Sequence, residues 1–121
     1  MQNAANLRVT AQARLLARAV YEQTSRFPKE ERFGLAAQMR RAAVSIGSNI
    51  CEGCGRHGNR ELTHFLQIAY GSVSELQFQA LLAGDLSLLS PEQAASLLDE
   101  ITRVKKMLSR LITALRGRRE G

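Results

Sequence analysis

The feature that most constrains the fold is a regular spacing of apolar residues near the end of the chain. Between residues 91 and 116 they recur in steps of four and three, at Leu97, Ile101, Val104, Leu108, Leu111 and Leu115. Such spacing lines up one side of an α-helix and, sustained for about three heptads, is typical of helices that pack side by side. Just before it, Ser90, Pro91 and Gln93 have the pattern of a capping box. We therefore predict a long helix whose apolar seam is covered by other helices.

Three earlier segments have the same helical periodicity. We expect helices at about residues 4–26, 29–54, 60–83 and 91–116, and a frayed tail at 117–121. No stretch alternates with a period of two, so no strand is expected. At 121 residues the chain is one domain by length. The predicted fold class is all-α: an antiparallel up-and-down four-helix bundle in a single domain.

Composition indicates in which cellular compartment the chain is expected. Hydrophobic residues make up 45% of it, which is too many for a disordered chain. No apolar run approaches the roughly 18 residues of a membrane span, and the start of the chain lacks the pattern of a secretory signal. The two cysteines form no disulfide framework. We expect a cytoplasmic protein with no membrane partner.

Positive charge is concentrated at the end of the sequence. The net charge is +6, and residues 101–121 contain seven basic residues and one acidic residue, so the first hundred residues are balanced. In an up-and-down bundle the first and fourth helices are antiparallel neighbours, which brings basic residues of both to one end. The residues expected at this end are Arg8, Arg14, Arg18, Arg110, Arg116, Arg118 and Arg119.

A basic surface of this kind favours acidic partners, with RNA or DNA first among them. The chain has four Phe, two Tyr and no Trp, which leaves little for base stacking, so we expect phosphate contacts without sequence readout. The alternative is a solubilising tail whose cations favour a helix C-terminus.

A polar stripe runs beside the apolar stripe of the second expected helix and faces polar residues of the third. We interpret it mainly as a structural network that fixes the register of the two helices, with a preferred salt bridge from Glu75 to Arg40 or Arg41. The alternative is a ligand or catalytic pocket in which Glu52 and Glu75 form a carboxylate pair. The expected network comprises Arg40, Arg41, Ser45, Asn49, Glu52, Ser72 and Glu75.

Cysteine and histidine residues near residues 51–64 form a second, weaker constellation. Cys51, Cys54, His57 and His64 offer four soft ligands of the kind that zinc takes. Their spacing is not that of a zinc knuckle, and cysteine on a helix is most often a small core residue. We therefore expect no metal, no cofactor and no catalytic residue. The chain also lacks a nucleophile–base pair and a glycine-rich phosphate loop, so an enzyme is not expected.

With these segments in place, the chain resembles the four-helix bundle proteins encoded within intervening sequences of 23S ribosomal RNA genes. The resemblance covers about residues 11–115 and is densest between residues 27 and 76. It rests on FPKEERFGL at 27–35, QMRRAAVSI at 38–46, SNI at 48–50 and EG at 52–53, and on Glu61, Phe65, Leu66, Ala69, Gly71, Ser72, Ser74, Glu75 and Leu76.

The resemblance implies a fold and an assembly rather than an activity. The family is similar to the accessory variability determinant of diversity-generating retroelements, which binds a reverse transcriptase and nucleic acid, and homopentamers occur in this group. No enzymatic activity is established for it. Small residues at 34–37 and 71–74 also suggest apolar surface left over for self-association, although all of it could pack internally. We expect a non-enzymatic homo-oligomer associated with nucleic acid; the alternative is an adaptor for an unidentified protein partner.

Overall fold

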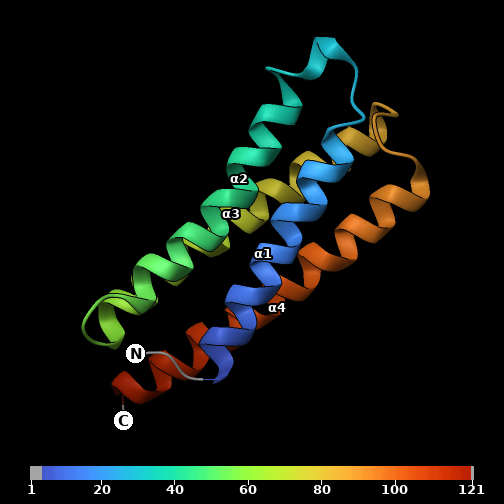
Figure 1. Ribbon diagram of the computed structural model, residues 1–121. Helices are drawn as coiled ribbons and strands as arrows, with labels where there is room; N and C mark the ends of the chain where they lie inside the picture. Colours follow the sequence, from blue (N-terminus) through green and yellow to red (C-terminus); the bar gives the residue numbers. More distant parts are fainter. Residues whose placement is uncertain (1–3, 121) are drawn as a thin grey trace.

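The chain folds into four antiparallel helices. The computed structural model describes the backbone of residues 4–120 and the side chains of residues 5–117. The helices are α1 (Ala4–Thr24), α2 (Leu35–Cys54), α3 (Asn59–Asp85) and α4 (Pro91–Glu120). Each runs antiparallel to the next and α1 packs beside α4, so the bundle closes on itself (Figure 1). The predicted fold class is confirmed.

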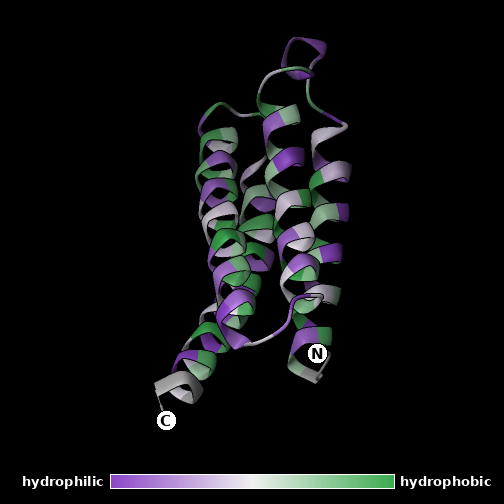
Figure 2. Ribbon diagram, turned by 90° about the vertical axis from the view of Figure 1, so that its left-hand side faces the viewer, coloured by the Kyte–Doolittle hydropathy of each residue, from purple (hydrophilic) through white to green (hydrophobic). Residues whose placement is uncertain are grey.

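The core lies along the central axis and is built from the apolar stripes of all four helices. Figure 2 shows hydrophilic and hydrophobic residues side by side along each helix. In α4, the seam residues Leu97, Ile101, Val104 and Leu108 are at most 1% exposed. Their counterparts on α2 and α3 are equally buried, among them Ile46 and Leu76. Within residues 4–120, no helix combines the length and the apolar character needed to cross a bilayer.

The second helix begins later than predicted. Residues Lys29–Glu31 form a 3₁₀ turn, and α2 starts only at Leu35. Gly34 has the non-helical angles φ −102° and ψ −116°, which interrupt the helix. The Leu35 N–H donates to Glu31 Oε1 at 3.3 Å, so the glutamate serves one of the free donors at the start of α2. The predicted start at residue 29 was wrong because this local cap replaces a helical turn.

The fourth helix begins as predicted and ends later. The Gln93 N–H donates to Ser90 Oγ at 3.1 Å and the Ser90 N–H donates to Gln93 Oε1 at 2.8 Å, which confirms the capping box. The backbone stays helical through Glu120, so the frayed tail predicted at 117–121 was wrong for residues 117–120. One glycine there, Gly117, costs only about 1 kcal/mol of helix propensity, and arginines favour the C-terminal end of a helix.

A half-buried carboxyl where α1 meets α4 provides a test of the packing. Burial raises the pKa of Glu100 above its ordinary value of 4.5, while Arg103 lowers it and Glu22 adds to the rise. The folded state thus holds this proton more tightly than the unfolded chain does. Protonation of Glu100 therefore stabilises the fold fully below the pKa of the unfolded state, and this stabilisation is lost as the pH rises through the pKa of the folded state. We expect Glu100→Gln to raise Tm at pH 7, with a gain that shrinks as the pH falls toward 4.

The matched control is Asp99→Asn, which makes the same change of charge at the exposed neighbouring position. Thermal unfolding of the three proteins at several pH values measures the effect. Equal Tm for wild type and Glu100→Gln at pH 7 would contradict the prediction, as would a gain that persists in acid.

Candidate nucleic-acid interface

The net positive charge of the chain belongs to one half of the bundle. The two chain ends and the α2–α3 loop lie at the same end (Figure 1). The half of the bundle toward that end consists of residues 4–14, 45–72 and 106–120, and contains nine basic and three acidic residues. The other half contains eight of each, so the whole excess of +6 lies in the first half. We call this half of the bundle, residues 4–14, 45–72 and 106–120, the basic end.

Most of the arginines predicted for the basic end are placed as expected. Arg8, Arg14, Arg110 and Arg116 are exposed on α1 and α4 in this half of the bundle. The side chains of Arg118 and Arg119 lie outside the described residues. Arg18 is also exposed, but it sits a turn past the midpoint of α1 and so belongs to the other half. It is the one described member of the predicted set that falls outside the basic end.

Sequence reasoning missed two arginines that the topology adds. Arg56 in the α2–α3 loop and Arg60 in the first turn of α3 are both exposed at the basic end. Arg56 is partly engaged: its Nε lies 3.1 Å from Glu52 Oε2 and its guanidinium lies 5.1 Å from the centre of the Phe65 ring. The sequence could have predicted their position, because an up-and-down bundle places the loop between its second and third helices at the end where the chain starts.

Aromatic side chains that could stack on bases lie elsewhere. The strongly exposed aromatics are Tyr21, Phe33 and Phe78, all in the half away from the basic end. At the basic end, Phe65 is partly buried and makes an edge contact with His64 at 5.4 Å between ring centres. The chemistry offered there is that of exposed guanidinium groups, which donate hydrogen bonds to phosphate oxygens.

Five of the seven residues of the predicted polar network fall into three separate groups. Between α2 and α3, Ser45 Oγ and Ser72 Oγ are 2.9 Å apart, and Asn49 Nδ2 donates to the Ser45 carbonyl at 2.8 Å and to Ser45 Oγ at 3.1 Å. This group ties the middles of α2 and α3 together. The second group is the Glu52–Arg56 pair near the loop, and the third involves Arg40.

The predicted salt bridge from Glu75 to Arg40 or Arg41 was wrong. Arg40 points to α1, where its Nε donates to Thr24 Oγ1 at 2.8 Å and its guanidinium lies 4.6 Å from the centre of the Tyr21 ring. Glu75 and Arg41 line one hollow but do not form an ion pair. Among the described side chains, the ion pair is between Glu52 and Arg56. Arg40 lies at the border between the side of α2 that faces α1 and the side that faces α3, and its guanidinium contacts α1.

The alternative carboxylate pair does not form either. Glu75 shares its hollow with Arg41 and Ser45, whereas Glu52 pairs with Arg56 two turns further along α2. Both carboxylates are exposed. They therefore lie at different levels of the bundle and do not converge on one reacting atom.

The two cysteines face different surroundings. Neither forms a disulfide; Cys51 is exposed and Cys54 is buried in the core. Across the described part of the chain, no three His, Cys, Asp or Glu residues come together in a group suited to a metal ion. Cys54 packs in the core, as is common for cysteine on a helix.

Together the fold and the charge define a class: a small antiparallel four-helix bundle whose positive charge is gathered at the end that carries both termini. Residues 5–110 match the 23S rRNA-intervening sequence proteins, and the chain belongs to this family. The resemblance drawn from the sequence is confirmed.

A crystal structure from Bacteroides thetaiotaomicron, of a protein of unknown function from the S23 ribosomal protein family, has the same fold. The two chains are 22% identical and superpose with a TM-score of 0.84, over 90% of this chain and 98% of the other. No match is found among curated proteins.

Proposed function

We propose that this protein is a non-enzymatic, homo-oligomeric bundle that associates with nucleic acid through its basic end. The observation that carries the proposal is the uneven charge, since the half of the bundle with the chain ends accounts for the whole excess of +6. Arg60, Arg110 and Arg116 are exposed there and, among the described side chains, have no carboxylate within 4.0 Å. They are available to an external anion.

The expected mode of binding is contact with the phosphate backbone. A guanidinium presents a planar fork of donors that matches two phosphate oxygens. With no strongly exposed aromatic at this end, base stacking contributes little, so binding is expected to be largely independent of sequence. The same interactions release counterions, and affinity should fall steeply as salt is added.

Neutralising Arg60, Arg110 and Arg116 to glutamine tests the site. We expect the triple variant to lose at least about tenfold in affinity for single-stranded RNA or DNA at low salt. The slope of log affinity against log salt should become shallower by about 2, since each lost phosphate contact contributes about 0.7 for single strands. Fluorescence anisotropy across a salt series measures both quantities, and removal of residues 116–121 should act in the same direction.

The matched control neutralises Arg26, Lys29 and Arg103, which are equally exposed but lie in the other half of the bundle. It makes the same change in net charge and should leave most of the affinity intact. Equal losses in the two variants would show a general charge effect instead of a site. Absence of binding by the wild type at low salt would end the proposal.

Self-association is the second part of the proposal. The family resemblance leads us to expect a homopentamer, and the supporting observation is exposed apolar surface: Phe33 is 87% exposed and Phe78 is 65% exposed. Phe33 lies in the α1–α2 connection and Phe78 on α3, and apolar side chains left uncovered in patches are typical of interaction sites. We also propose that the protein works in the cytoplasm, in keeping with two cysteines that are not joined by a disulfide.

The same exposed aromatics favour one alternative function, an adaptor or scaffold for an unidentified protein partner without direct nucleic-acid binding. Affinity capture before and after nuclease treatment separates the two. A partner protein that stays bound after nuclease, together with no binding to purified RNA or DNA, favours the adaptor.

A further inference from the structure

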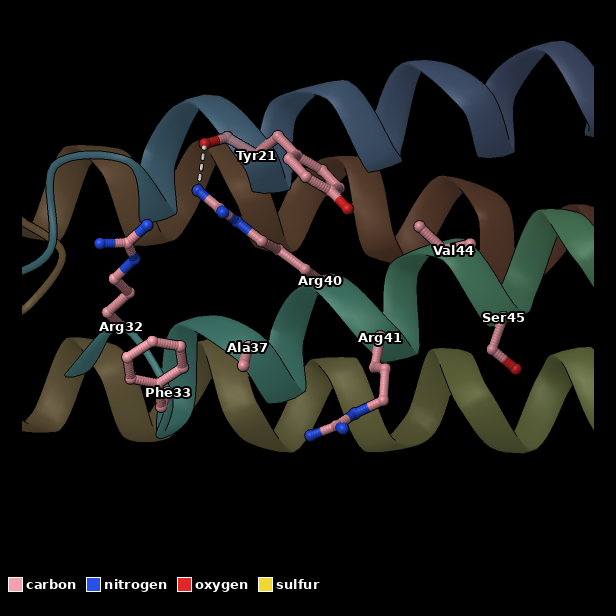
Figure 3. A pocket seen from close by; sticks show the side chains of 8 residues that line it. All are labelled: Tyr21, Arg32, Phe33, Ala37, Arg40, Arg41, Val44 and Ser45. Carbon is pink, nitrogen blue, oxygen red and sulfur yellow. Dashed lines mark hydrogen bonds between the residues drawn. The ribbon is translucent and has the colours of Figure 1, made fainter.

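A groove on the outer side of α1 and α2 combines apolar and cationic residues. Its volume is about 620 Å³, and it is lined by Tyr21, Phe33 and Val44 together with Arg32, Arg40 and Arg41. Figure 3 shows these side chains spread from α1 across α2, with Arg41 reaching toward α3. The three apolar residues named are each at least 46% exposed, so the bundle leaves this surface uncovered.

The charge of the groove is unbalanced. Arg40 is held in place by Thr24 and the Tyr21 carbonyl, and the Arg32 guanidinium lies 5.5 Å from the centre of the Phe33 ring. Among the described residues no carboxylate lines the groove itself, although Glu75 of the same chain shares an adjoining hollow with Arg41. A partner that fills it must therefore bring apolar side chains for its floor and negative charge for its arginines.

A surface with that chemistry exists on the same chain, along the outer side of α3. Its residues recur in steps of four and three, the spacing of a coiled-coil seam: His64, Ile68, Gly71, Glu75, Phe78 and Leu82. We call this set the outer seam. It is separate from the inner stripe of α3, which is buried in the core. Ile68 and Phe78 are 41% and 65% exposed, and Glu75 and the nearby Asp85 are exposed carboxylates.

Gly71 gives an independent reason to place another molecule on the outer seam. It lies in the middle of α3, where glycine costs about 1 kcal/mol relative to alanine. A Cβ at this position would meet nothing within 4 Å in the chain, so packing within the bundle does not require a glycine. A glycine on an exposed helix face allows close approach of a backbone from outside.

We propose that the outer seam of one copy docks into the α1–α2 groove of a second copy. The inference rests on the proposed self-association and assigns its two surfaces. Phe78 and Ile68 of the seam would cover the apolar floor of the groove, and Glu75 and Asp85 would face Arg32 and Arg41. Because the two surfaces differ, the contact is head-to-tail, and repeated contacts form a closed ring or a filament according to the rotation between neighbours.

Two single variants, each placed on an exposed side chain, test the pairing. Phe33→Asp removes the most exposed apolar residue of the groove and adds a negative charge, which repels the carboxylates near the seam. Phe78→Arg removes the most exposed apolar residue of the seam and adds a positive charge, which repels the arginines of the groove. We expect each variant to fall from the wild-type mass to that of a single chain in light scattering. Circular dichroism should show unchanged helix content, because neither side chain belongs to the core.

Mixing the two variants provides the sharper measurement. Phe33→Asp keeps an intact seam and Phe78→Arg keeps an intact groove, so an equimolar mixture should form a complex of one copy of each and grow no further. The matched control is Leu15→Asp, an equivalent change on the outer face of α1, at a residue that is 46% exposed and does not line the groove. It should keep the wild-type mass.

Other outcomes overturn the inference in distinguishable ways. If the wild type is oligomeric and either variant keeps its mass, or if the mixture stays monomeric, the assigned surfaces are wrong while self-association stands. If the wild type is itself a single chain at micromolar concentration, self-association fails together with the inference. Neither result bears on the salt-dependent binding expected of the basic end.

Discussion

Replacing Ile46 by alanine is expected to lower the free energy of unfolding by about 2–5 kcal/mol. Ile46 is 0% exposed and lies on the core side of α2, the helix that makes its most extensive contact with α3. Its truncation removes buried hydrocarbon and leaves a cavity that packed helices fill only in part. The total stability of a domain of this length is roughly 6–18 kcal/mol, so the loss is a large share of it.

Urea denaturation at one protein concentration measures the effect, since self-association adds to apparent stability. Ile46→Val should cost only about 0.5–1.5 kcal/mol, because it removes one methylene group. Leu15→Ala, at a residue that is 46% exposed, should change stability by less than about 0.5 kcal/mol. A loss for Ile46→Ala no greater than that of Leu15→Ala would contradict the burial assigned to Ile46.

Gly53→Ala is expected to destabilise the protein by about 1–3 kcal/mol, although alanine is the better helix former. A Cβ at residue 53 would lie 2.9 Å from Phe65 Cβ, 3.1 Å from Leu62 Cδ1 and 3.3 Å from the Leu62 carbonyl oxygen. Two of these atoms belong to the base of a side chain and to the backbone of α3, so the helices must separate where α2 ends.

Gly47→Ala is the matched control on the same helix. Its Cβ would meet Ala13 Cβ at 4.0 Å, an ordinary contact, so the gain in helix propensity should raise stability by up to about 1 kcal/mol. Thermal or urea unfolding of the two variants should therefore give shifts of opposite sign. Stabilisation by Gly53→Ala would mean that α2 and α3 are less closely packed at this point than the structure has them.

Much of the fold follows from periodicity alone. The apolar seam of α4, from Leu97 to Leu108, is buried as its spacing predicts, and the capping box forms as the serine and glutamine indicate. Helical spacing specifies which side of a helix turns inward, and the number of helices specifies their antiparallel order. These two facts sufficed to bring Arg8 and Arg116 to one end.

Helical periodicity did not predict which side chains pair with one another. Arg40 lies on a border between two faces of α2, and periodicity does not tell whether α1 or α3 receives it. The 3₁₀ turn at Lys29–Glu31 was missed because backbone hydrogen bonds close it, from the Glu31 N–H to the Pro28 carbonyl and from the Arg32 N–H to the Lys29 carbonyl. Side-chain periodicity carries no sign of such bonds. The prediction of the basic end used only the first and fourth helices and so missed Arg56 and Arg60, although the topology also brings the α2–α3 loop to that end.

The even number of helices has a practical consequence for anyone handling this protein. Whatever is fused to either terminus, such as an affinity tag or a fluorescent protein, emerges at the basic end and would screen the surface that is to be measured (Figure 1). Labels and attachment points for immobilisation are better placed at the opposite end of the bundle, for example at the exposed residue Glu30 in the α1–α2 connection. A tag-dependent affinity for RNA would then be recognised as steric blocking of the surface.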